Sequence, residues 1–404
     1  MKNLKDLILD TAAPGERADP FFSQYGLRRN PFPSNRTILP EVLYNQQPAI
    51  KRFAELFREI LSPTPTRRAL AVFAGTGGGK THFLRHCRWN CETALQELGR
   101  RLVFVEFQAG SGKVQDVTRE ILGAADSFVR TVGEENLVTA LVKKVSSETD
   151  LLNGIAQFDL RSALTTLVAA YSPGFKPKDR AGVFNYESLR EVCQRWLNGA
   201  TLTQTERKYL GVMSRIGTAS YAVRVLTETL RLARQIELFE GLVLSLDEIE
   251  TIFTRGSSAS QYQSFLQDLR YLYDESVKNE VGYSLFVLSA STPYGANSLR
   301  QVNYPVFTRL GFEEDQRVTL QPIADFEEAK LFAAEYISFE RRQFNKGDGQ
   351  FPELVSEVEI QQAFQTGAGP TTVRGSRATV NQAPLLDALH KLVEEKKTAA
   401  HLES

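Results

Sequence analysis

Residues 74–81 read AGTGGGKT, and this glycine-rich stretch decides how the rest of the chain is interpreted. It follows the apolar run ALAVF at residues 69–73 and precedes a segment with the apolar spacing of an amphipathic helix. A glycine loop between a strand and a helix fits the pattern G-x-x-x-x-G-K-[ST] at its last three defined positions, with Ala74 in place of the first glycine. Alanine fits there because the strand ends at this point, unless a positive φ is required.

The loop has the composition that phosphate binding needs. Backbone N–H groups converge on phosphate oxygens in conformations that a Cβ disfavours. We therefore expect Lys80 to contact the β and γ phosphates of ATP, Thr81 to bind Mg²⁺, and the dipole of the following helix to favour the same phosphates. The residues expected to contact the nucleotide here are Gly75, Thr76, Gly77, Gly78, Gly79, Lys80, Thr81 and His82. The alternative is a flexible glycine turn with no ligand.

An acidic pair ends a second apolar run. LVLSL at residues 242–246 leads directly into Asp247 and Glu248. At a strand tip, Asp247 would hold Mg²⁺ through water, and Glu248 would polarise the attacking water as a general base. The alternative is a solvated acidic turn, but the pairing with a phosphate loop favours a hydrolytic site.

Five apolar runs predict a parallel sheet. Their continuous apolar character is typical of strands buried on both faces, and the helical segments between them give the βαβ alternation of a doubly wound α/β fold. The predicted strands cover residues 69–73, 102–107, 242–246, 284–289 and 317–320.

The interval of about 110–240 between the second and third strands predicts a large helical insertion. Thr203 and Glu206 have the spacing of a capping box. The expected helices cover about 114–131, 136–147, 185–198, 205–211 and 219–239, the last with an apolar stripe at Ala222, Val225, Leu226, Leu230, Ala233 and Ile236.

These patterns divide the chain into an N-terminal arm (1–45), an α/β core with its insertion (46–322) and a helical lid (323–404). Prolines interrupt the arm, and its segment YGLRRNPF, residues 25–32, is expected to pack against a domain surface. Asp325 and Glu328 predict a capped lid helix through about residue 340, followed by helices over 355–366 and 384–397.

Three further positions are candidates for the hydrolytic site. Thr292, or else Ser291, follows the fourth strand and could orient water. Arg309 precedes the fifth strand and could reach the γ-phosphate of a neighbouring subunit. Arg374, or else Arg377, could report on nucleotide state from the lid. For Thr292 the alternative is an ordinary polar turn, and for the arginines it is a solvated surface.

Taken together, the glycine loop, the acidic pair, the polar strand end, Arg309 and the helical lid occur in the order found in AAA+ ATPases. Over residues 46–395 the chain resembles the initiator-type branch, which includes origin-recognition and transposition-regulator ATPases. The arm segment is similar to the Gly-Leu-x-x-Asn-Pro-Phe opening of bacterial ATPases of the secretion and transposition groups. The resemblance implies a five-stranded parallel sheet of order 5-1-4-3-2, ATP hydrolysis coupled to lid movement, and composite sites in an oligomer.

A narrower resemblance lies in residues 194–250. RWLNG at 195–199, the Glu206–Arg207 pair and GLVL at 241–244 leading to the acidic pair are similar to ATP-binding proteins encoded beside BREX phage-defence genes. This resemblance implies a role in bacterial phage defence or a mobile-element system.

Composition sets limits on the partners. Lys plus Arg and Asp plus Glu are balanced at 48 each, so any contact with DNA must come from a local patch, for which Arg67, Arg68, Arg100 and Arg101 are candidates. Those arginines are equally explained as a solvated rim. The three cysteines (Cys87, Cys91 and Cys193) are expected to be buried thiols. We find neither a membrane-spanning run nor a signal peptide, and expect a cytoplasmic protein with no membrane partner.

These observations predict an ATP- and Mg²⁺-dependent AAA+ switch or motor, forming a homo-oligomer and acting on DNA or a DNA-bound partner. The alternative is a nucleotide-gated scaffold that binds protein partners through the insertion with little turnover. A kinase or GTPase is disfavoured because the acidic pair has its own distant strand and no Asn-Lys-x-Asp motif is present.

Overall fold

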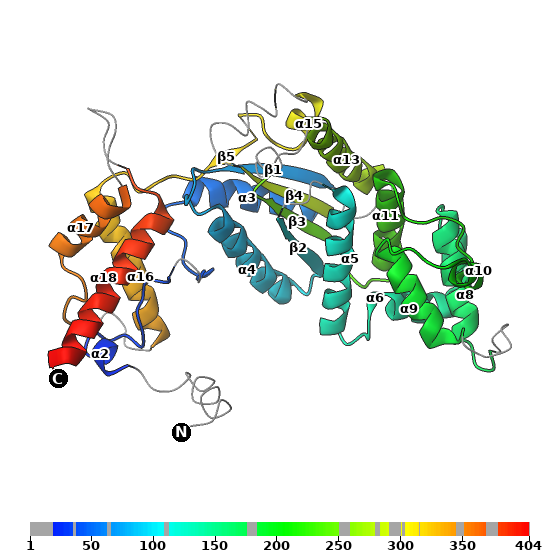
Figure 1. Cartoon of the computed structure of the whole chain (residues 1–404), viewed down its shortest axis with the longest axis horizontal. Helices are drawn as coiled ribbons and strands as arrows, with labels where there is room; N and C mark the ends of the chain where they lie inside the picture. The colour runs from blue at the N-terminus through cyan, green and yellow to red at the C-terminus, as the bar shows by residue number, and fades with distance from the viewer. Residues whose placement is uncertain are drawn as a thin grey trace. The chain divides into compact units, whose positions relative to one another are not determined.

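The computed structural model describes residues 19–34, 38–62, 66–108, 113–175, 184–249, 259–278, 283–290, 300, 304–314, 316–344, 351–368 and 379–403. Five strands form one sheet (Figure 1). They are β1 (Arg67–Phe73), β2 (Leu102–Gln108), β3 (Gly241–Asp247), β4 (Tyr283–Ala290) and β5 (Val318–Thr319). The predicted strands are therefore confirmed.

All strand pairs are parallel, in the order β2-β3-β4-β1-β5. This is the predicted order 5-1-4-3-2 read from the other side. β4 lies between β1 and β3, with Phe73 opposite Ala290 and Leu246 opposite Leu288. The carboxyl ends of β1 and β3 therefore share one edge of the sheet, and the residue after Phe73 is the first of the glycine loop.

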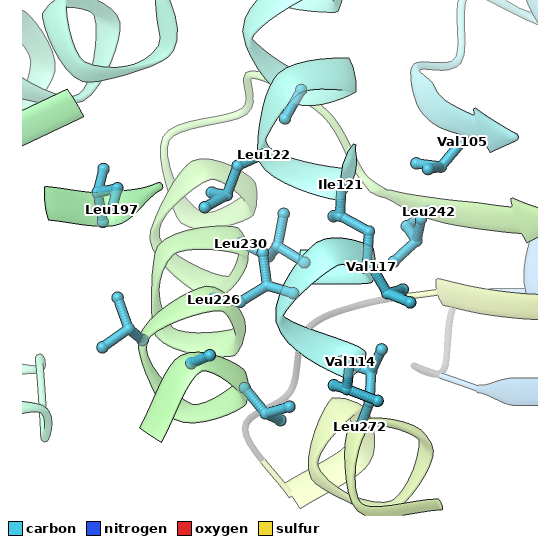
Figure 2. Packing of buried hydrophobic residues seen from close by; sticks show 14 of the residues in the cluster. Val105, Val114, Val117, Ile121, Leu122, Leu197, Leu226, Leu230, Leu242 and Leu272 are labelled. Carbon is cyan, nitrogen blue, oxygen red and sulfur yellow. The ribbon is translucent and has the colours of Figure 1, made fainter. Parts of the chain in front are cut away.

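Alternate strand residues face a core that continues into the insertion. α5 (Val114–Thr131) contacts β2 and α11 (Ala219–Gln235). Figure 2 shows Ile121 of α5 beside Leu242 of β3, while Leu122 extends from the other side of α5 toward the insertion helices. One buried cluster includes all three side chains, so α5 joins the insertion to the sheet. The opposite face of the sheet contacts α3 (Gln47–Ile60) at β1 and β4.

The other insertion helices are α6 (Leu137–Ser147), α7 (Asp150–Asn153), α8 (Phe158–Tyr171), α9 (Tyr186–Leu197) and α10 (Gln204–Leu210). The predicted capping box is present: the Thr203 hydroxyl accepts from the Glu206 N–H at 3.2 Å, and the Glu206 carboxylate accepts from the Thr203 N–H at 2.8 Å. The predicted apolar stripe on α11 is buried. α7 and α8 were not predicted from the sequence.

The remaining helices of the sheet part are α13 (Ala259–Lys278) and α15 (Tyr304–Arg309). The described residues form two compact units, whose bounds are given as ranges of the chain. The sheet unit comprises Gln47–Phe73 and Asn90–Thr319. The lid unit comprises Met1–Gln46, Ala74–Trp89 and Leu320–Ser404, so the glycine loop belongs to the lid unit. α4 (Lys80–Leu98) begins in the lid unit and ends in the sheet unit.

The lid unit has its own core, built from α16 (Phe326–Gln343), α17 (Glu357–Ala368), α18 (Gln382–Glu403) and the arm with α2 (Pro20–Ser23). Leu27 and Phe32 of the arm are fully buried in this core. The Asn30 amide donates to the His390 carbonyl at 3.2 Å and to Glu394 at 2.8 Å. The expectation that the arm segment packs against a domain is confirmed.

At the start of α16, Asp325 is the N-cap, but the reciprocal bond of the predicted capping box goes to Ala324 and not to the N–H of Asp325. Asp325 accepts from the Glu328 N–H at 3.0 Å, while the Glu328 carboxylate accepts from the Ala324 N–H at 2.8 Å. All three cysteines are buried, and burial raises the pKa of Cys91 and Cys193 to about 12. Within the described ranges, no helix is long and apolar enough to cross a bilayer.

Candidate nucleotide-binding site

The glycine loop adopts conformations that explain its sequence. Gly77 and Gly79 have φ angles of +73° and +84°, in the left-handed region that residues with a Cβ rarely adopt. A Cβ on Gly78 would lie 2.7 Å from the Ala74 Cβ and 2.8 Å from the Gly75 carbonyl oxygen. Ala74 itself does not take a positive φ and is almost fully buried, so the first glycine of the pattern is not needed.

Lys80 begins α4 directly after the loop. Its Nζ donates to the Ala74 carbonyl at 3.3 Å, which brings the ammonium group back over the loop. The Phe83 N–H donates to the Gly79 carbonyl at 2.8 Å, so the first helical turn follows the last glycine without a break. The loop therefore presents glycine backbone, one ammonium group and the start of a 19-residue helix together.

His82 and His86, on the first turns of α4, hold the arm. His82 Nε2 lies 2.8 Å from the Leu39 carbonyl oxygen, and His86 Nδ1 lies 2.6 Å from that of Pro40. Burial lowers the pKa of both rings. The contact of His82 is thus with the arm, and its contact with a nucleotide stays a prediction.

At the tip of β3 the two acidic residues differ in their surroundings. The Asp247 side chain is buried, and its Oδ1 accepts from the Ser289 hydroxyl and, at 2.9 Å, from the Glu248 N–H. Glu248 is exposed and has a φ of +55°, an uncommon conformation for a residue with a Cβ. Such backbone outliers concentrate at functional sites. Asp247 is therefore held in place, while Glu248 is an exposed residue in a constrained turn.

Ser289 was not among the predicted site residues. It is fully buried on β4, next in register to Asp247 because Leu288 pairs with Leu246. The pairing of two parallel strands of known order would have identified it. The predicted candidates Thr292 and Arg374, and their alternates Ser291 and Arg377, lie outside the described residues.

Arg309 lies far from this edge. Its Nη1 is 2.5 Å from Asp274 Oδ2, and Arg67 at the amino end of β1 is 3.3 Å from Asp274 Oδ1. Arg270 also contacts Asp274, at 3.4 Å. Because β1 spans seven residues at about 3.3 Å each, roughly 20 Å separates its two ends. The sheet unit thus gathers three arginines around one carboxylate toward its amino edge.

The four basic residues considered for DNA are engaged locally. Arg67 pairs with Asp274, Arg68 with Glu59, and Arg100 with Glu240 at 2.5 Å. The Arg101 guanidinium donates to the Glu237 carbonyl at 3.5 Å. Carboxylates offset most of this charge, as in a solvated rim.

The donor set fits magnesium. Mg²⁺ prefers oxygen ligands and is usually bound by one or two protein oxygens together with substrate phosphates. Ser289 and the Glu248 N–H both donate to Asp247, which fixes the orientation of its carboxylate. Within the described part of the chain, no cluster of three or more His, Cys, Asp or Glu side chains could hold a metal ion.

The parallel order β2-β3-β4-β1-β5, with a phosphate-type loop after β1 and an acidic pair after β3, defines the class as a AAA+ P-loop protein. Residues 90–319 match the model of the family BREX system ATP-binding protein BrxC/D. Because this match covers more than half of the chain, the chain belongs to that family. The resemblance noted in residues 194–250 is confirmed, and the matched region includes Asp247 but not the glycine loop.

Two solved structures are similar to the chain. The ORC1 protein of Aeropyrum pernix, in complex with DNA, matches with a TM-score of 0.44 and 13% identity over 89% of this chain and 62% of that one. The ORC2 protein of the same organism, in ADPNP–ADP complexes, matches with a TM-score of 0.45 and 14% identity over 91% of this chain and 72% of that one. Comparison with curated protein sequences gives no match.

Proposed function

We propose that this BREX-family ATP-binding protein hydrolyses ATP at a single site formed by the glycine loop and the tip of β3. The supporting observation is the sheet order. β1 and β3 flank β4 in parallel, so the loop leaves the sheet at the edge where Asp247 and Glu248 end β3. In open α/β sheets, ligands bind at this carboxyl edge.

In this proposal the loop binds the phosphates. Backbone N–H groups within residues 75–81 and the Lys80 ammonium group surround the β and γ phosphates, and the helix dipole of α4 favours their negative charge. Lys80 already lies over the loop through the Ala74 carbonyl, so little side-chain entropy is lost on binding.

The buried Asp247 and the exposed Glu248 have different roles in this proposal. Thr81 and Asp247 would hold Mg²⁺, which when bound neutralises charge on the phosphates. Asp247 is rigid because Ser289 fixes its carboxylate. Glu248 is exposed and takes a proton from the attacking water. Thr292 would orient that water, and Arg374 would contact the nucleotide from the lid.

Arg309 acts in trans in this proposal. It shares Asp274 with Arg67, which lies at the other end of β1 from the glycine loop. That separation supports contact with the γ-phosphate of a second copy rather than its own, and so a homo-oligomer with composite sites.

The test of hydrolysis uses Lys80→Ala and Glu248→Gln. We expect wild type to release phosphate from ATP in a Mg²⁺-dependent reaction. Glu248→Gln should retain ATP affinity and lose about 10²–10⁴-fold in kcat. Lys80→Ala should lose ATP binding. Normal turnover by Lys80→Ala would refute the site.

We further propose that hydrolysis acts on DNA or a DNA-bound partner within the BREX system. The test is the rate of ATP hydrolysis with and without duplex DNA at two salt concentrations. No stimulation and no salt-sensitive binding would count against DNA. If Glu248→Gln leaves BREX function and partner binding unchanged, the scaffold alternative, with the insertion as its binding surface, replaces the motor.

A further inference from the structure

The start of α18 contacts the glycine loop within the lid unit. The Asn381 Nδ2 donates to the Thr76 carbonyl at 2.8 Å, and the Ala383 N–H donates to the Gly77 carbonyl at 3.1 Å. A Cβ on Gly75 would lie 3.3 Å from the Asn381 amide nitrogen, and one on Gly77 would lie 3.1 Å from the Pro384 ring. The loop and α18 are therefore in close contact.

These two hydrogen bonds fix the orientation of peptide groups in the loop. A peptide group is planar and trans, so holding its carbonyl on one side directs the N–H of the next residue to the other. Asn381 thereby orients the Gly77 N–H. Ala383 orients the Gly78 N–H, which donates to the Gly75 carbonyl at 2.9 Å and closes the turn. Glycine backbone loses more entropy than any other when it is ordered, so this preordering favours ligand binding.

Gln382, which lies between Asn381 and Ala383, connects the start of α18 to the arm. Gln382 is buried, and its Nε2 donates to the Tyr44 carbonyl at 3.1 Å. Just before it, Val380 exchanges two backbone hydrogen bonds with Ile323, at 2.8 and 3.0 Å. Asn381 is thus held on a fixed piece of backbone.

We propose that Asn381 is a positioning residue, which holds the loop in its phosphate-binding shape from the start of α18. This inference rests on the proposed function of the loop. Asn381 acts on the loop backbone and not on the γ-phosphate, so it contributes equally to the binding of ATP and ADP. A residue that senses the γ-phosphate would instead distinguish the two nucleotides.

The experiment measures the affinities of the full chain for ADP and for a non-hydrolysable ATP analogue by calorimetry, for wild type, Asn381→Ala and Asn381→Asp. The matched control is Asn198→Ala, because the Asn198 amide likewise donates to a backbone carbonyl, that of Gln194, at 3.0 Å on an exposed surface. Melting temperatures without nucleotide and values of KM and kcat complete the set.

We expect Asn381→Ala to weaken the binding of ADP and of the ATP analogue by the same factor. That factor should be up to about 10-fold, which corresponds to the net free energy of one hydrogen bond. Asn381→Asp should lose more affinity for both nucleotides, because it adds a negative charge beside the loop. KM should rise more than kcat falls, and the melting temperature without nucleotide should match that of Asn198→Ala.

Unchanged affinities for Asn381→Ala, or a loss confined to the ATP analogue, would overturn the inference. So would an equal loss in Asn198→Ala. A wild-type protein that binds neither nucleotide, or a Lys80→Ala variant that binds both normally, would instead overturn the proposed function.

Discussion

Asp247 and Ser289 form a buried hydrogen-bonded pair at the carboxyl edge of the sheet, where the proposed chemistry takes place. Asp247 was identifiable from sequence because a carboxylate directly after an apolar run is distinctive. Ser289 was not, because a serine within a largely apolar strand carries no signal until the register of β4 against β3 is known. Glu248 was predicted, but its positive φ was not.

Ser289→Ala is expected to raise the Mg²⁺ concentration needed for half-maximal ATP turnover by about 10-fold, since the hydroxyl no longer orients Asp247. The measurement is a magnesium titration of phosphate release. Ser284→Ala is the matched control, because Ser284 is equally buried near the other end of β4 and its hydroxyl has no hydrogen-bond partner among the described residues. Equal magnesium requirements in both variants would contradict this role.

The stability of the protein depends on pH through His82. Burial lowers the pKa of His82 from its ordinary value of 6.5, and nearby His86 lowers it further, against the hydrogen bond with Leu39 and the charge of Glu41. The unfolded chain therefore takes up protons first as the pH falls below 6.5. The neutral ring of folded His82 therefore contributes its full stability above pH 6.5. As the pH falls from 6.5 toward the lowered pKa of the folded state, this contribution decreases.

His82→Gln retains a donor for the Leu39 carbonyl and removes the titration. We expect its melting temperature to fall less than that of wild type between about pH 7.5 and 5.5. His86 titrates in both proteins and serves as an internal reference. Parallel curves would show that the arm contact does not depend on the charge of His82.

At the level of elements, the periodic patterns predicted most of the helices, because α5 and α11 each carry one apolar stripe that is buried in the core. α8 was missed. Its sequence includes Thr165, Thr166 and Val168, whose β-branched side chains weaken helix propensity, and its stability comes from burial of Leu160, Leu164 and Leu167 in the insertion. α8 is stable because of its tertiary packing, which the local sequence does not reveal.

Asp159, a buried acid of α8, links this helix to residues 213–221 of the insertion through hydrogen bonds. It accepts from the N–H groups of Met213 and Ser214 at 2.9 and 3.0 Å and from the Tyr221 hydroxyl at 2.5 Å. Asp159→Ala removes the shared acceptor of these three donors, so three hydrogen bonds to a charged group are lost, and should lower the free energy of unfolding by about 3 kcal/mol. The measurement is denaturant unfolding.

The control for this prediction is Asp150→Ala, at an exposed acid in the first turn of α7, which should change stability little. If Asp159→Ala unfolds at the same denaturant concentration as Asp150→Ala, the three contacts of Asp159 do not stabilise the insertion.

For the whole molecule, sequence predicted the sheet order and the family but not the grouping of the glycine loop with the lid. That grouping depends on contacts of Asn381 and Ala383 with Thr76 and Gly77, which are about 305 positions apart in the chain. No local pattern encodes such pairs.

The proposed composite site requires two copies of the chain to assemble. Arg309→Ala should keep its affinity for nucleotide and lose about 10³-fold in turnover, because the γ-phosphate of the neighbouring copy loses its arginine. Mass measured with and without an ATP analogue should rise for wild type. Arg130→Ala, at an exposed arginine paired with Asp126, is the control. Turnover per chain that is independent of protein concentration, with normal activity in Arg309→Ala, would contradict a composite site.

The central claim is that the glycine loop and the tip of β3 bind one Mg²⁺–ATP. An experimental structure of the Glu248→Gln protein with ATP and Mg²⁺ tests it most directly. We predict phosphates surrounded by the N–H groups of residues 75–81, with Thr81 bound to the metal, Asp247 within one water of it and the side chain at position 248 facing the γ-phosphate. A nucleotide bound elsewhere, or an Asp247 remote from the metal, would contradict the claim.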